Sequence, residues 1–335
     1  MKKIVILISI LIFFFFAMFN NTSIAKATGA IHHVGGNNLS NYSKIQHAVN
    51  NASKDDTIFV HKGIYSEPLK IYKKINLIAE HGAVLDFNGS DDIVSIKADG
   101  CTVDGFTIRN CSGGVYFGIK IEKEIYNVIL KNNIFLNNSG NSLYLYYSSY
   151  NNISNNTFFN DGIFIVGKKL DWNTHIITNN VVNNNPILYL KNKKNVNISN
   201  KNLGQIILAN CSNSEIKNNC VYGGNIGIFL GFSNNNSIIG NNINYNIFGI
   251  RLQYSNRNNL INNYIRKNSY GLFIQHSKKN TIKQNTISNN SIDGAHFCCD
   301  SKENIIFISD FISNKVNAYD ILENYWHKKG IGNHW

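Results

Sequence analysis

The apolar residues of this chain return in phase every 22 residues between Ser214 and Asn290. One apolar position is held by Ile216, Ile238, Leu260 and Ile282, and a second by Val221, Ile243, Ile265 and Ile287. A period this short predicts a solenoid, in which each repeat is one turn of chain that buries its apolar side only by stacking on its neighbours.

Within each repeat, paired apolar residues lie two positions apart, as in Ile228 and Leu230 or Ile250 and Leu252. This alternation is typical of strands and not of helices. The strands are separated by Asn, Gly and Ser, which tolerate tight and left-handed turns. We therefore predict an all-β fold, a right-handed parallel β-helix with three short strands per rung and roughly ten rungs of about 22 residues.

Asparagine recurs at one fixed position of the repeat, and its phase is too regular to follow from composition. The four residues are Asn219, Asn241, Asn263 and Asn285. Stacked rungs lie about 4.8 Å apart, so that equivalent residues touch. We expect these side chains to form a ladder of amide hydrogen bonds from rung to rung.

The ends of the chain predict export and a capped solenoid. Lys2-Lys3, an apolar run to Phe19 and the sequence Ala25-Lys26-Ala27 read as a signal peptide over residues 1–27, with an uncleaved anchor as the alternative. Residues 28–74 are expected to form an N-terminal cap with an amphipathic helix at 42–52, residues 75–322 the β-helix, and residues 323–335 a C-terminal tail. The exported chain is expected to be extracellular or surface-bound and not integral to a membrane.

The chain is basic, and this affects the choice of partner. Its net charge is +12, and loss of Lys2, Lys3 and Lys26 with the signal leaves +9. A basic exported protein favours acidic partners, above all an anionic polysaccharide or cell-surface glycan, and we do not expect nucleic acid. The alternative is that lysines scattered over turns serve only solubility.

Two parts of the chain resemble known β-helix families. Residues 45–67 resemble the capping region of pectate-lyase-like proteins, and the repeat resembles the NosD-type β-helix of periplasmic copper-processing proteins and archaeal surface proteins. Residues 204–212 and the closing motifs Asn324-Tyr325-Trp326 and Gly332-Asn333-His334-Trp335 are similar to the archaeal surface group. In that group the last motif continues, which implies an incomplete C-terminal region. The resemblance covers residues 42–335 and implies the fold, but this fold hosts lyases, hydrolases, binding proteins and adhesins.

The outward positions of the Gly-Ile-x-Leu strand in each repeat carry the candidate binding residues. One outward column reads Phe229, Arg251, Phe273 and His296, and the next reads Gly231, Gln253, Gln275 and Cys298, with Phe232, Tyr254 and His276 at the turn. Aromatic rings stack on sugars, whereas amides and guanidinium groups bind hydroxyls. We predict substrate binding by Phe229, Arg251, Gln253, Tyr254, Phe273 and Gln275, extended by Tyr144, Tyr146, Tyr147 and Tyr150. The alternative is that these rings only pack against neighbours.

A metal site is the second hypothesis. If one residue is inserted near Gly294, His276, His296, Cys298 and Cys299 lie at one edge, and they would suit copper or zinc. The resemblance to NosD also points to copper. Against this, both methionines of the chain precede residue 28, and the cysteine pair could simply fill space. We expect no other cofactor.

Catalysis is the least supported class. No Asp or Glu lies between Glu215 and Asp293, whereas glycoside hydrolysis needs two carboxylates and the lyases of this fold use an acidic cluster. A polysaccharide lyase or hydrolase would have to use Asp161 and Asp171 or Asp293 and Asp300. The leading hypothesis is a secreted, non-catalytic, adhesin-like or carbohydrate-binding β-helix protein.

Overall fold

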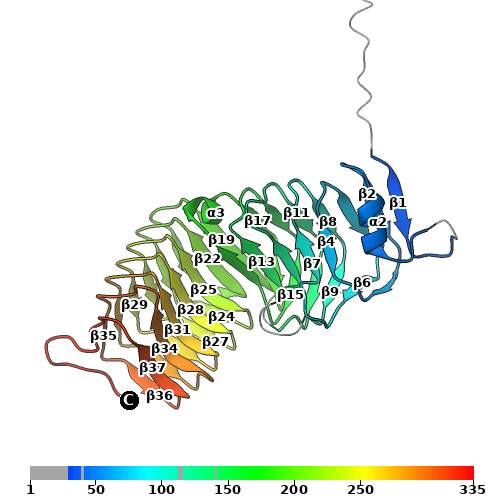
Figure 1. Ribbon diagram of the computed structural model, residues 1–335. Helices are drawn as coiled ribbons and strands as arrows, with labels where there is room; N and C mark the ends of the chain where they lie inside the picture. The colour runs from blue at the N-terminus through cyan, green and yellow to red at the C-terminus, as the bar shows by residue number, and fades with distance from the viewer. Residues whose placement is uncertain (1–28, 39–40, 112–115, 140–141) are drawn as a thin grey trace, which may run out of the picture.

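The protein is a parallel β-solenoid. The computed structural model describes residues 29–38, 41–111, 116–139 and 142–335, so the predicted signal peptide lies outside the described residues. Short strands stack along the whole molecule, with the helix α2 (Ile45–Asn51) beside the first rungs (Figure 1). The predicted fold and capping helix are confirmed.

The N-terminal arm, residues 29–184, has three sheets. A seven-stranded sheet contains β1 (Ile31–Val34), β2 (Thr57–Val60), β5 (Asn76–Ala79), β8 (Thr102–Asp104), β11 (Ile129–Lys131), β14 (Asn152–Ser154) and β17 (Ile176–Thr178). A five-stranded sheet contains β4 (Leu69–Ile71), β7 (Val94–Ile96), β10 (Ile119–Ile121), β13 (Leu143–Tyr146) and β16 (Ile163–Val166). The third sheet begins with β3 (Gly63–Tyr65), β6 (Ala83–Asp86), β9 (Thr107–Arg109), β12 (Ile134–Leu136), β15 (Thr157–Phe159) and β18 (Val181–Val182).

That third sheet, called the long sheet here, continues through the C-terminal arm, residues 185–335. Its further strands are β19 (Asn185–Lys191), β22 (Gln205–Ala209), β25 (Ile226–Gly231), β28 (Phe248–Gln253), β31 (Tyr270–Gln275), β34 (Asp293–Cys298) and β37 (Val316–Asp320). The long sheet thus has thirteen strands, and the expectation of roughly ten rungs was too low.

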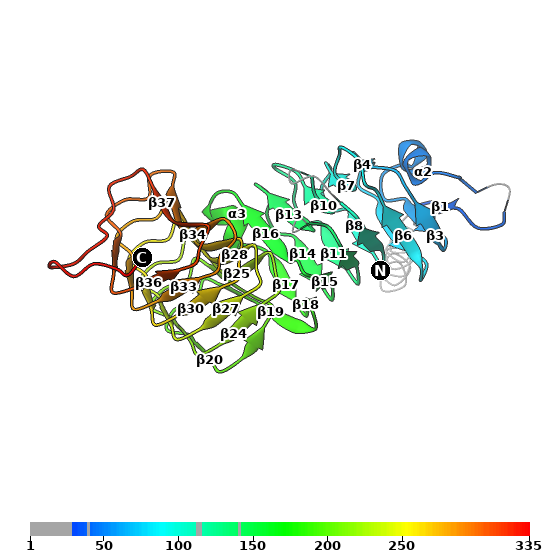
Figure 2. The same cartoon turned by 90° about the horizontal axis from the view of Figure 1, so that it is seen from below.

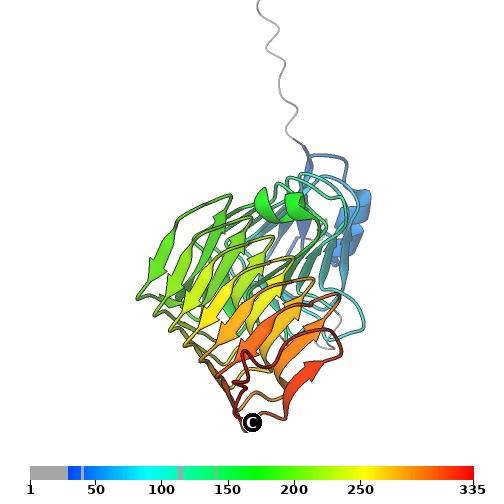
Figure 3. The ribbon, with the colours of Figure 1, turned by 90° about the vertical axis from the view of Figure 1, so that its left-hand side faces the viewer.

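Two six-stranded sheets complete the C-terminal arm, whose successive coils are seen end-on in Figure 3. One contains β20 (Asn197–Ser199), β23 (Glu215–Lys217), β26 (Ser237–Ile239), β29 (Asn259–Ile261), β32 (Thr281–Lys283) and β35 (Ile305–Phe307). The other contains β21 (Asn202–Leu203), β24 (Cys220–Tyr222), β27 (Asn242–Asn244), β30 (Tyr264–Arg266), β33 (Thr286–Ser288) and β36 (Asp310–Ile312).

The two arms meet at a reversal of the chain. β18 pairs antiparallel with β19, and both residues of the connecting turn, Asn183 and Asn184, have positive φ, at 47° and 65°. Two positive φ values define the type I′ turn that favours tight hairpins, and asparagine tolerates them well. The stack of rungs is therefore interrupted here and resumes as a second arm (Figure 2).

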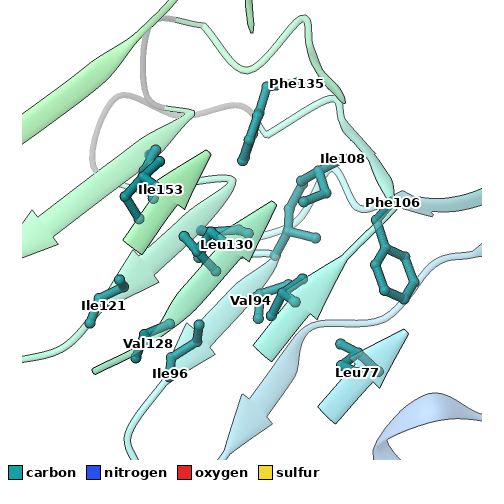
Figure 4. Close-up of a cluster of buried hydrophobic side chains, with 14 of the residues drawn as sticks. Leu77, Val94, Ile96, Phe106, Ile108, Ile121, Val128, Leu130, Phe135 and Ile153 are labelled. Atoms are coloured by element: carbon teal, nitrogen blue, oxygen red, sulfur yellow. The ribbon is translucent and has the colours of Figure 1, made fainter. Parts of the chain in front are cut away.

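Each arm has its own hydrophobic core. Inward residues of the N-terminal arm, such as Val94, Ile121 and Leu130, form one cluster (Figure 4). The C-terminal arm is filled by the in-phase columns of Ile and Leu predicted from the repeat. Ile207 and Phe229, from the outer face of the C-terminal arm, belong to the N-terminal cluster and not to their own. The outer face of the long sheet therefore covers the end of the N-terminal core.

The predicted asparagine ladder is present. Asn219, Asn241 and Asn263 each donate from Nδ2 to Oδ1 of the next member at 3.0 Å. The described residues form three further ladders that were not predicted. They consist of Asn133, Asn156 and Asn180, of Asn236, Asn258, Asn280, Asn304 and Asn324, and of Asn246, Asn268, Asn290 and Asn314. These amides are hydrogen-bonded and, apart from the half-buried Asn314 and Asn324 at the C-terminal end, they are buried, so the ladders hold the turns in register.

Candidate functional site

The strand register brings the predicted binding residues into line on the outer face of the long sheet. Phe229 pairs with Arg251, Arg251 with Phe273, and Phe273 with His296. The second column is also in register, with Gln253 opposite Gln275 and Gln275 opposite Cys298. The expected one-residue insertion near Gly294 is present, because Leu272 pairs with Ala295.

Planar side chains stack along this face at the spacing of the rungs. The Cζ atom of Arg251 lies 4.7 Å from the ring centroid of Phe273, which stacks on His296 at 4.7 Å, and His296 stacks on Tyr319 at 4.7 Å. We call Arg251, Phe273, His296, Tyr319 and the turn residues described next the aromatic face.

A second stack lies at the turn after each strand of the long sheet. Phe232 stacks on Tyr254 at 4.8 Å, and Tyr254 stacks on His276 at 4.6 Å. All three have positive φ, between 48° and 53°, which is uncommon for bulky residues. Ring stacking offsets part of this backbone cost, which is roughly 1 kcal/mol per residue.

Phe229 corrects the expectation of an open column. Its side chain is 0% exposed, because the ring of Trp172 packs edge-on against it at 4.5 Å and Phe164 lies at 5.8 Å. Trp172 comes from α3 (Lys169–Asn173), a short helix between β16 and β17. A ligand therefore cannot contact Phe229, whose role is to join the arms.

The sequence reasoning missed α3 and its contacts. The only signal was spacing, since Asn156 and Asn180 are 24 residues apart where the regular repeat has 22. Gln205 was missed as well. Its side-chain amide bonds both the N–H (3.0 Å) and the carbonyl (2.9 Å) of Ile163, and so takes the place of a further strand beside β16.

Arg251 lies at the centre of the aromatic face and has an unusual environment. It is 8% exposed, and its Cζ lies within 4.8 Å of the ring centroids of Phe164, Phe248 and Phe273. Its Nη2 donates to Oε1 of Gln275 at 2.9 Å, while its Nε has no hydrogen-bond partner within the described parts of the chain. Burial lowers the pKa of Arg251 to about 10.

No carboxylate pairs with Arg251 among the described residues. Their ion pairs all involve other cations, and Gln253, beside Arg251, has a buried Oε1 with no hydrogen-bond partner. A buried cation normally has an anionic partner, because removing it from water is costly. The site therefore offers an unpaired positive charge and an unsatisfied amide next to stacked rings.

The tyrosine cluster of the N-terminal arm adjoins this point. Tyr144 stacks on Phe117 at 4.2 Å and contacts Phe164 at 5.4 Å, and Phe164 in turn contacts Arg251. Burial raises the pKa of Tyr144 to about 12. The outer faces of the five-stranded sheet and the long sheet thus share one aromatic contact region.

The predicted metal ligands lie near one another, but their side chains do not point toward one common position. His296 Nδ1 bonds Asp293 Oδ2 at 2.7 Å, and His276 is stacked on Tyr254. Burial and the adjacent Cys299 raise the pKa of the Cys298 thiol to about 12, which favours the protonated form over the thiolate that binds metal. Within the described residues, no three His, Cys, Asp or Glu side chains are placed to hold a metal ion. As arranged, these residues do not fit a copper or zinc centre.

The candidate catalytic carboxylates have structural partners. Asp161 is fully buried and accepts hydrogen bonds from Ser142 Oγ (2.6 Å) and the N–H of Gly162 (2.7 Å). Asp171 accepts from Ser149 Oγ at 2.7 Å and from the N–H of Lys168 at 2.8 Å. Asp300 is exposed and forms an ion pair with Lys278 at 2.6 Å.

Comparison with known families agrees with this architecture. A family model described as "right handed beta helix region" matches residues 17–203, which is more than half of the chain. The chain belongs to this right-handed β-helix family. A second family model, described as "periplasmic copper-binding protein (NosD)", matches residues 173–335, so the NosD-type repeat is also confirmed.

Several solved structures match this chain at low sequence identity and low TM-score. The A-module of a mannuronan C-5 epimerase from Azotobacter vinelandii matches with a TM-score of 0.34 and 12% identity, over 87% of this chain and 93% of that one. A pectin methylesterase from Aspergillus niger gives 0.32 and 12%, over 91% of each chain. A periplasmic alginate epimerase gives 0.34 and 14%, over 86% of this chain and 83% of that one.

A comparison with curated proteins finds no match. In the part of the chain that the structure describes, no helix is long and apolar enough to cross a membrane.

Proposed function

We propose that this protein is an exported, non-catalytic, adhesin-like β-helix protein that binds an acidic polysaccharide on its aromatic face. The observation that carries the proposal is Arg251, a buried cation with no carboxylate partner among the described residues. A uronate carboxylate of the ligand would supply the missing anion. Charged hydrogen bonds of this kind are about twice as strong as neutral ones.

The surroundings of Arg251 support a sugar ligand. Phe273 and Tyr254 offer the edges of their rings, because neighbouring side chains stack on both faces of each ring. Gln275 offers an amide for hydroxyl groups, and the buried amide of Gln253 lies opposite it. The stacked arrangement also repeats at the spacing of the rungs, which suits an extended polymer more than a small molecule. We therefore place the binding residues at Arg251, Gln253, Tyr254, Phe273 and Gln275.

Charge along the chain supports an acidic ligand. Residues 216–292 contain eight Lys and Arg residues and no Asp or Glu. A surface of one sign attracts polyanions and speeds their encounter, and salt screens this attraction within about 8–10 Å.

Affinity electrophoresis tests the proposal. The chain is run through gels that hold pectate, alginate, hyaluronate or a neutral glucan. We expect retardation by an acidic polymer, lost in Arg251→Gln and kept in Arg257→Gln, which removes the same charge from an exposed turn. Equal retardation of both variants, or none of the wild type, would contradict the proposal. If the protein releases new chain ends from the polymer, it is a lyase or hydrolase, and the non-catalytic proposal is wrong.

Binding of copper or zinc at His276, His296, Cys298 and Cys299 is a second proposal. Its support is that the NosD family model spans all four residues. The side chains would have to move to share one ion. Titration of the reduced protein with Cu(I) against a chromophoric competitor tests it, because a genuine site would be lost in Cys298→Ser/Cys299→Ser.

A further inference from the structure

A surface pocket of about 430 Å³ lies beside the entry of the chain into β28. Its polar and aromatic lining comes from both arms and includes Asn160, Tyr245, Lys267, Ser269, Asn289 and Ser291. Asn160 is the contribution of the N-terminal arm, and its side chain is held by Asn183 at 3.0 Å. None of these lining residues belongs to the aromatic face.

Tyr245 and Lys267 form the chemical centre of this pocket. The Nζ of Lys267 donates to the hydroxyl of Tyr245 at 3.0 Å and lies 5.3 Å from the ring centroid. The hydrogen bond from Lys267 and its charge lower the pKa of Tyr245. The tyrosine is 60% exposed, so most of its ring is open to a ligand.

The backbone at these two residues is strained relative to neighbouring rungs. Tyr245 and Lys267 have φ values of 57° and 55°, and the same turn position is filled by Gly223 and Asn289 in adjacent rungs. Glycine and asparagine adopt positive φ at little cost, whereas larger residues lose roughly 1 kcal/mol. A tyrosine and a lysine at adjacent strained positions therefore point to a function on the surface.

Lys267 has no anionic partner among the residues that the structure describes. It forms none of the ion pairs found among the described residues, and no acid occurs in sequence between Glu215 and Asp293. An exposed ring beside an unneutralised ammonium, surrounded by amides and hydroxyls, matches one acidic sugar unit. The ring would stack on the sugar, and the ammonium would pair with its carboxylate.

We propose that the Tyr245–Lys267 pocket is a second subsite for a uronate unit of the same polysaccharide that binds at Arg251. This inference rests on the proposed function. Phe248 lies between the two sites, since its ring is 4.8 Å from Cζ of Arg251 and follows Tyr245 by three residues. Six residues of extended chain span at most about 20 Å. A short oligosaccharide thus reaches one subsite, and a longer one reaches both.

Calorimetric titration with digalacturonate and hexagalacturonate separates the two subsites. We expect Tyr245→Gly and Lys267→Asn, which introduce residues used at this turn in adjacent rungs, to weaken hexasaccharide binding about tenfold. A second contact on one ligand contributes through effective concentration, so disaccharide binding at Arg251 should not change. Tyr264→Ala, at a 58% exposed tyrosine outside the pocket, should bind like the wild type.

The outcomes distinguish this inference from the function on which it rests. If both pocket variants bind the hexasaccharide as the wild type does while Arg251→Gln does not, the second subsite is wrong and the proposed function stands. If the wild type binds no hexasaccharide of galacturonate, glucuronate or mannuronate, both proposals fail.

Discussion

At the scale of the residue, Arg251 shows how function can be separated from stability. The fall of its pKa from 12.5 to about 10 corresponds to roughly 3 kcal/mol against the buried charge. Cation–π contacts with several rings stabilise the guanidinium by about 2 kcal/mol. These terms nearly cancel, so the guanidinium contributes little to folding.

We therefore predict that Arg251→Met abolishes retardation by acidic polymer while the free energy of unfolding changes by no more than about 1 kcal/mol. Methionine keeps the contact with the rings and removes the buried charge. Urea denaturation measures the stability. A loss of about 3 kcal/mol or more, as for a broken buried ion pair, would mean that Arg251 has a structural role.

At the scale of the element, the last rung of the N-terminal arm contains two buried titratable groups with opposite effects. Burial raises the pKa of Asp161 from 3.8 to about 7 and lowers that of His175 from 6.5 to about 4. Asp161 binds its proton more tightly in the folded state, so its contribution to stability is lost as pH rises from about 4 to 7. His175 binds its proton less tightly when folded, so its contribution is lost as pH falls from about 6.5 to 4.

We predict that, as pH rises from 4 to 7, the free energy of unfolding of Asp161→Asn increases relative to that of the wild type by up to about 4 kcal/mol. For His175→Gln the pH dependence is reversed. Its free energy of unfolding should increase relative to that of the wild type by up to about 3 kcal/mol as pH falls over the same range. Thermal or urea unfolding of the three proteins across this range measures both effects. A pH-independent difference between Asp161→Asn and the wild type would show that Asp161 is ionised in the fold.

At the scale of the whole molecule, the contact between the arms determines where the aromatic face begins. Gly231 lies against Trp172 so closely that an added Cβ would be 2.1 Å from the indole ring. The arms have separate cores, and such units can unfold separately once their interface is weakened.

We predict that Gly231→Ala costs about 1–3 kcal/mol at the contact between the arms and splits thermal unfolding into two calorimetric transitions. Gly332→Ala is the matched control, because its nearest neighbour would lie 3.9 Å away and the substitution should leave the transition unchanged. A single transition for Gly231→Ala at the wild-type temperature would show that the arms do not depend on this contact.

The sequence alone determined the solenoid, the inward columns, one asparagine ladder and the order of the outward residues from Phe229 to His296. These features repeat along the chain, and in a parallel stack a period in sequence becomes contact in space. The tertiary structure decided which outward residues are open. Phe229 is buried and Arg251 nearly so because the Asn183–Asn184 turn reverses the chain and brings Trp172 and Phe164 onto this face. Because that contact involves residues outside the repeat, the periodicity of the sequence could not predict it.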